Sequence, residues 1–83
     1  MSRANKQLEK MKRNPRDWRI DDLKVIADRL GLMYRQPGTS HVTFRANSGE
    51  KLTVPAHKPI KPIYVKKFVE LIDWMKHQGA NFD

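Results

Sequence analysis

Three short runs rich in β-branched and aromatic residues lie close together in the middle of this 83-residue chain, and they limit its fold more than any other feature. The runs read LMYRQ, HVTFR and KLTVP, and the turn-forming stretches PGTS and ANSGE separate them. Strands joined by such short connections pair with their neighbours in antiparallel order. The pattern therefore predicts a three-stranded antiparallel meander.

Amphipathic helices are predicted on both sides of these strands. The first has its apolar face at Leu23, Ile26, Ala27 and Leu30. The second has its apolar face at Val65, Phe68, Val69, Ile72 and Met75. Gly31 and Gly79 follow the two patterns, as glycines commonly do at helix ends. We therefore expect an α+β fold in the order α-β-β-β-α, with both helices on one face of the sheet.

The length and composition limit what kind of site the chain can carry. A domain of this size buries only about 60–65% of the surface of its unfolded chain, so we expect any active site to lie on the surface. The sequence has no cysteine, which excludes disulfides, thiolate metal sites and a cysteine nucleophile. The N-terminal stretch MSRANKQLEKMKRN lacks the apolar run of a signal peptide, and no run is long enough to span a bilayer. The expected location is the cytoplasm.

The balance of charge favours a polyanionic partner. Seventeen Lys and Arg residues against nine Asp and Glu residues give a net charge of +8, which favours nucleic acid through counterion release. Residues 1–16 form a basic N-terminal arm, which is either flexible or an additional contact to RNA or a protein partner; residues 17–83 form the single domain. A second basic cluster surrounds a proline-rich loop and comprises Lys58, Lys61, Lys66 and Lys67. We interpret it as attracting a nucleic-acid backbone, and the alternative is a solvated helix face.

A histidine stands where the middle strand is expected to begin. Side chains alternate along a strand, so Val42 and Phe44 face the helices, which places His41 on the open face. Arg45 and Lys51 fall on the same open face. An accessible histidine, with an ordinary pKa of about 6.5, can take or give a proton near neutral pH. The alternatives are a solvated surface histidine and a core histidine, and the second would require the opposite strand phase.

Other catalytic sites fit the sequence poorly. Ser40 and His41 are neighbours, so in an extended chain their side chains are expected to diverge and not to form a nucleophile and base pair. The three histidines are not at metal-ligand spacing, and the position of His77 at a helix end is explained by the helix dipole. The stretch NSGEK is too short for a phosphate-binding loop. We expect neither a metal nor a nucleotide cofactor.

The stretch GTSHVTFR…SGEKLTVPAHKPIKPIYVKKFVELI resembles the HicA family of bacterial toxins, which are mRNA interferases. The family pattern runs Gly-Ser-His, a strand, a glycine-rich turn, a Val-Pro strand end, a loop with His and Lys, and a closing helix. The resemblance covers roughly residues 20–75 and is strongest at Ser40-His41, Ser48-Gly49, Thr53-Val54-Pro55 and residues 57–67. Thr39 departs from the pattern, because the family has glycine immediately before the serine.

The resemblance implies a fold like that of double-stranded-RNA-binding domains, ribosome-independent RNA cleavage, and neutralisation by a HicB-type antitoxin encoded beside the toxin. RNA can be cut without metal because its deprotonated 2′-hydroxyl attacks the neighbouring phosphorus. The family and the strand phase together indicate His41 as the general acid or base, with Arg45 and Lys51 as phosphate contacts. His57 is the weaker second catalytic candidate.

Two other classes of protein remain open from the sequence. A non-catalytic RNA-binding module would share the α-β-β-β-α order and would need no acid or base. A DNA-binding regulator would need a recognition helix with polar side chains for the groove, and neither predicted helix clearly provides one. Loss of the histidine separates the first class from a nuclease, because a binding module tolerates that loss.

Overall fold

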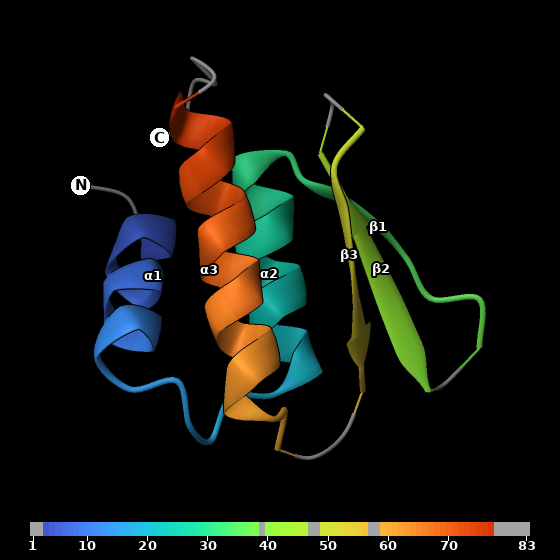
Figure 1. Ribbon diagram of the computed structural model, residues 1–83, viewed down its shortest axis with the longest axis horizontal. Helices are drawn as coiled ribbons and strands as arrows, with labels where there is room; N and C mark the ends of the chain where they lie inside the picture. The colour runs from blue at the N-terminus through green and yellow to red at the C-terminus, as the bar shows by residue number, and fades with distance from the viewer. Residues whose placement is uncertain (1–2, 39, 47–48, 57–58, 78–83) are drawn as a thin grey trace.

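The computed structural model describes residues 3–38, 40–46, 49–56 and 59–77 (Figure 1). In chain order the elements are the helices α1 (Arg3–Arg13) and α2 (Ile20–Leu30), the strands β1 (Met33–Arg35), β2 (His41–Arg45) and β3 (Lys51–Pro55), and the helix α3 (Pro62–His77). The strands form one antiparallel sheet in the order β1-β2-β3. The predicted α+β fold, with its three-stranded meander between helices, is confirmed.

Local sequence signals define both ends of α2. At its start the Asp22 carboxylate accepts the backbone N–H of Arg19 at 3.0 Å, which satisfies one of the free donors at a helix N-terminus. At its end Gly31 adopts φ 72°, a left-handed conformation that glycine reaches at little cost. The apolar face predicted from the spacing is buried, as Leu23, Ile26, Ala27 and Leu30 all lie in the core.

The sheet packs one face against the helices. Val42, Phe44 and Val54 are fully buried, and the rings of Phe44 and Phe68, the latter from α3, pack edge to face with their centroids 5.0 Å apart. His41, Arg45 and Lys51 are exposed, which confirms the strand phase predicted from the alternation. The predicted apolar face of the last helix is also buried at Val65, Phe68, Val69, Ile72 and Met75.

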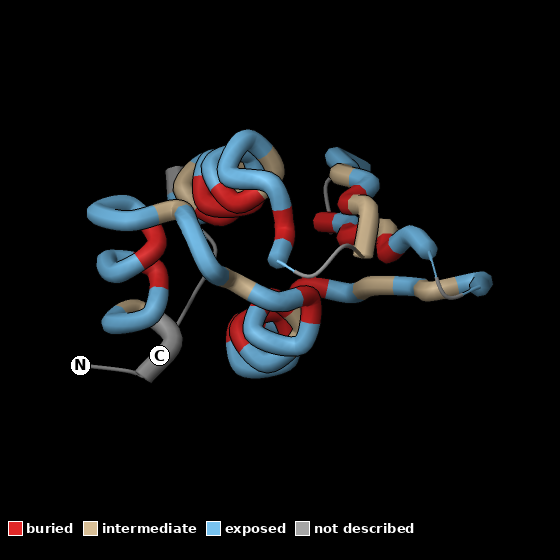
Figure 2. The backbone as a smooth tube through the Cα atoms, turned by 90° about the horizontal axis from the view of Figure 1, so that it is seen from below, coloured by how far each residue is buried: buried red, intermediate tan, exposed pale blue. Residues whose placement is uncertain are grey.

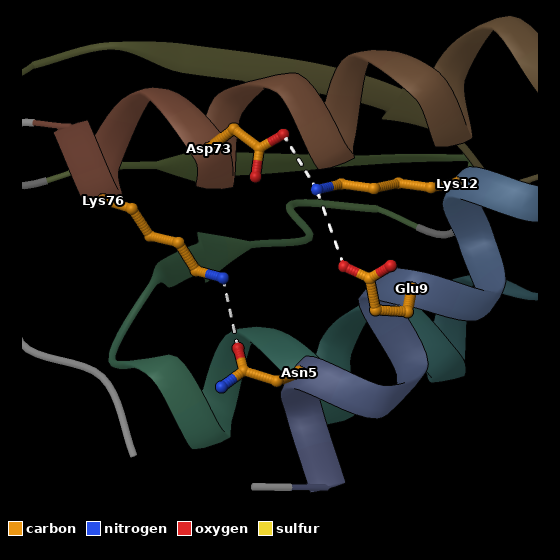
Figure 3. A network of polar contacts seen from close by, with 5 residues as sticks. All are labelled: Asn5, Glu9, Lys12, Asp73 and Lys76. Carbon is orange, nitrogen blue, oxygen red and sulfur yellow. Dashed lines mark hydrogen bonds and ion pairs between the residues drawn. The ribbon is translucent and has the colours of Figure 1, made fainter. Parts of the chain in front are cut away.

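The basic segment at residues 1–16, predicted as an arm apart from the domain, contains the helix α1. Leu8 and Met11 of this helix are buried in the common core. Lys12 lies 3.4 Å from the Asp73 carboxylate of α3, and Lys76 of α3 donates a hydrogen bond to Asn5 at 3.2 Å (Figure 3). This packing is hard to predict from the sequence, because Leu8 and Met11 are the only large apolar side chains in a highly charged helix.

The helices and the sheet lie in layers. Figure 2 shows α2 and α3 between the sheet on one side and α1 on the other. Contacts join α1 to both of these helices, while α2 contacts β1 and α3 contacts β3. Within the part of the chain that the structure describes, no helix covers the opposite face of the sheet. We call this the outer face; it carries the exposed residues His41, Arg45 and Lys51.

Candidate nucleic-acid interface

The outer face carries positive charge and no acidic side chain among its described strand residues. Strand alternation and the pairing register place on it Met33, Arg35, His41, Thr43, Arg45, Lys51, Thr53 and Pro55. The hydroxyls of Thr43 and Thr53, which are opposite each other, share a hydrogen bond of 3.0 Å. The face therefore offers cations, hydroxyl groups and one imidazole to an anionic ligand.

His41 is the first residue of β2 and is exposed at one end of the outer face. Its Nδ1 lies 3.3 Å from the Ser40 hydroxyl, at the long end of hydrogen-bond distance. The expectation that these two side chains diverge is therefore wrong. Ser40 precedes the strand, so the alternation of a regular strand does not apply to it. When Nδ1 carries the proton and donates to Ser40, Nε2 has the free electron pair of a base.

The end of β3 lies beside the start of β2, where His41 stands. The backbone N–H of Ala56 donates to the carbonyl of Ser40 at 2.8 Å, and Pro55 is opposite His41 in the register. Ala56 therefore lies beside Ser40, at the end of the sheet that carries His41. His57 and Lys58, the second catalytic candidate and one of the predicted RNA contacts, lie outside the described residues.

Arg45 and Lys51 share the outer face with His41 but stand at its other end. They are opposite each other in the register, and Arg45 is four residues from His41 along β2, which corresponds to roughly 13 Å. The two cations and the imidazole therefore meet different points of any bound chain. Arg35 is closer, because it is opposite Thr43 and is therefore a diagonal neighbour of His41 on the adjacent strand, roughly 7–8 Å away.

Arg35 is the residue that the sequence interpretation missed. Its outward orientation follows from alternation with Tyr34, but its closeness to His41 depends on the register between β1 and β2. Residues 36–40 connect these strands, and a connection of this length does not fix a register as a two-residue turn does.

The remaining predicted RNA contacts are not gathered around His41. Lys61 is exposed just before α3, where its backbone carbonyl accepts the N–H of Tyr64 at 2.9 Å. Lys66 borders a shallow groove between α1 and α3, beside Lys12. Lys67 is exposed on α3, and this helix packs on the face of the sheet opposite to the outer face.

A depression on the outer face extends from Arg45 and Lys51, at the end distant from His41, to Arg35 and Thr43, which are nearer to it. Its volume is about 380 Å³, and it is lined by Met33, Tyr34, Arg35, Pro37, Thr43, Arg45 and Lys51. Partial burial and a 3.3 Å hydrogen bond from its hydroxyl to the Asp28 carboxylate raise the pKa of Tyr34 above its ordinary value of 10.0. The ring itself lies on the helix side of the sheet, where its centroid is 5.7 Å from that of the buried Phe44.

The described residues show no other centre of this kind. Among them, no three His, Asp or Glu side chains are grouped closely enough to hold a metal ion. None of the described helices has the length and apolar character that a membrane crossing requires.

Comparison of the chain with protein-family models, with curated proteins and with solved structures gave no match.

Proposed function

We propose that this chain is the toxin component of a type II toxin-antitoxin system, an mRNA interferase that cuts RNA without a metal ion and without the ribosome. The observation that carries the proposal is an exposed histidine at the end of a cationic sheet face that no described helix covers. The HicA-like sequence Ser40-His41 supports the same role for this imidazole. Because mRNA is the substrate, the proposed place of action is the cytoplasm.

In the proposed mechanism His41 moves the proton that starts the reaction. Its Nε2 takes the proton of a ribose 2′-hydroxyl, and the resulting oxygen attacks the adjacent phosphorus. The bond from phosphorus to the 5′-oxygen of the next nucleotide breaks, and that oxygen receives a proton. The products are a 2′,3′-cyclic phosphate and a free 5′-hydroxyl, so no water is consumed in this step.

Two neighbours of His41 have supporting roles in this proposal. The Ser40 hydroxyl, 3.3 Å from Nδ1, orients the ring and selects the tautomer with a basic Nε2. Arg35 is the described cation nearest to His41 in the strand register, and its guanidinium is suited to the charge that develops on the phosphorane oxygens. His57 remains the proposed source of the second proton transfer.

The substrate itself tests this mechanism. We expect the purified chain to cut single-stranded RNA in EDTA as fast as in magnesium, because imidazole and the 2′-hydroxyl supply the chemistry. An RNA with one deoxyribose at the cut position is the matched control and should resist cleavage there. Gel analysis of the fragments and their termini measures both effects. Efficient cleavage of single-stranded DNA, or loss of all cleavage in chelator, contradicts the proposal.

A non-catalytic RNA-binding module is the alternative, because the α-β-β-β-α order also belongs to double-stranded-RNA-binding domains. The same assay separates the two functions. A binding module would shift labelled RNA in a gel and leave it intact, whereas the proposed nuclease cuts it.

A further inference from the structure

The depression on the outer face combines charge with apolar surface. Met33, Arg45 and Lys51 form one row across the three strands, because Met33 is opposite Arg45 and Arg45 is opposite Lys51. Met33 is 67% exposed and so presents a large apolar side chain at the β1 end of this row, beside Arg45. Pro37 adds apolar lining at the edge of the same depression.

This lining is suited to both the phosphate and the base of a nucleotide. Three cations line the depression and no acidic side chain does, which favours a phosphate group. The exposed thioether and the flat guanidinium groups suit the face of a base, since bases stack on arginine planes as well as on aromatic rings. Its volume of about 380 Å³ lies within the usual range of about 300–1,000 Å³ for small-ligand sites.

The geometry points to a subsite that holds one nucleotide of a single-stranded RNA and is centred on Arg45 and Lys51. Arg45 is roughly 13 Å from His41 along β2, and the lining reaches towards His41 as far as Arg35 and Thr43. The inference rests on the proposed function for the direction of the RNA, which crosses the outer face from the imidazole to this depression. A substrate must then extend beyond the cleaved bond to reach the subsite. Short oligonucleotides that end near the cut are expected to be poor substrates.

Salt dependence of binding tests the subsite independently of cleavage. The probe is a fluorescently labelled single-stranded RNA of about twelve nucleotides, with 2′-O-methyl groups so that it is not cut. We expect Arg45→Ala and Lys51→Ala each to weaken binding several-fold and to reduce the slope of log affinity against log salt by about 0.7. Fluorescence anisotropy measures both quantities.

Two further variants separate charge from apolar contact. Met33→Ala should weaken binding while the salt slope stays unchanged, because no phosphate contact is lost. Arg29→Ala is the matched control for the loss of one positive charge, since Arg29 is exposed on α2, a helix on the other side of the sheet. This variant should bind like the original chain. Circular dichroism confirms that each exposed substitution leaves the fold intact.

The outcomes for the subsite and for the proposed function differ. If Arg45→Ala and Lys51→Ala have the affinity and salt slope of the Arg29→Ala control, the subsite is wrong even where the chain cuts RNA. If they lose affinity and slope as expected but unmodified RNA is never cut, the subsite stands and the nuclease proposal fails. Loss of binding to an acidic protein partner alone, with RNA binding unchanged, also overturns the subsite.

Discussion

His41 and Val42 are neighbours in β2 with opposite environments, and this contrast allows chemistry and stability to be tested separately. The imidazole is exposed on the outer face, while Val42 has no exposed surface. The Ser40 hydroxyl near Nδ1 gives the imidazole a defined orientation, which an isolated surface histidine would lack. The proton transfer proposed for His41 and the core packing of Val42 thus belong to adjacent positions of one strand.

We expect His41→Ala to remain folded, with a change in the free energy of unfolding of no more than about 0.5 kcal/mol, because no core contact is lost. Its cleavage rate should fall by roughly 10²–10⁴-fold, the usual contribution of a positioned acid or base. RNA affinity should change little, since lysine and arginine supply most of it. Single-turnover cleavage and chemical denaturation measure the two effects.

Val42→Ala is the matched control at the neighbouring position. It should lower the free energy of unfolding by about 1–3 kcal/mol through lost packing and reduce activity only as far as the chain unfolds. If His41→Ala is folded and still cuts RNA at the original rate, the assignment of His41 is wrong and His57 becomes the residue to test.

Among the elements, α1 is the one whose place depends most on contacts distant in sequence. It covers the side of α2 and α3 that faces away from the sheet, with Leu8 and Met11 in the core. Its polar contacts to α3 lie at the surface, where Lys12 and Asp73 remain partly exposed. Exposed ion pairs contribute little to stability, so we attribute the docking of α1 to its two apolar side chains.

Leu8→Ala tests this assignment. We expect it to lower the free energy of unfolding by about 2 kcal/mol or more, because a buried leucine leaves both transfer energy and a cavity behind. Lys12→Ala is the comparison within the same helix and should cost less than about 1 kcal/mol. Thermal or urea unfolding measures both variants. Equal effects of the two substitutions would contradict an apolar basis for the docking.

The elements also show how far the sequence alone could lead. The spacing of Leu23, Ile26 and Leu30 predicted α2, and alternation about Val42 and Phe44 predicted which strand residues face the core. These features are periodic, and a period can be seen without knowledge of the partner surface.

Features that depend on pairing between distant segments were not predictable in this way. The helix α1 needs the apolar surface of α2 and α3 to bury Leu8. The position of Arg35 depends on the strand register, and the contact between Ser40 and His41 depends on the local turn before β2. Each of these is a property of the assembled fold and not of one periodic segment.

On the scale of the whole molecule, the net charge of +8 and the uncovered outer face both favour an acidic partner. An unrestrained RNA-cleaving toxin would stop growth of its own cell, so the proposal includes a HicB-type antitoxin. The outer face already holds His41, and a protein seated there would exclude RNA from the imidazole. Release of the antitoxin during a stress response would then expose the site.

We therefore expect the chain to form a stable complex with a small acidic protein, and the neighbouring reading frame is the first one to test. Expression of the chain alone should arrest growth, co-expression with the antitoxin should restore it, and His41→Ala should permit growth without the antitoxin.

Complex formation should weaken with salt, because charge complementarity increases the association rate and is screened by ions. Affinity pull-down at low and high salt measures the complex, with His41→Ala as the bait that cells tolerate. If that bait recovers no partner at low salt, the antitoxin proposal fails. If His41→Ala still arrests growth, the toxicity does not depend on the imidazole, and the catalytic role proposed for His41 is wrong.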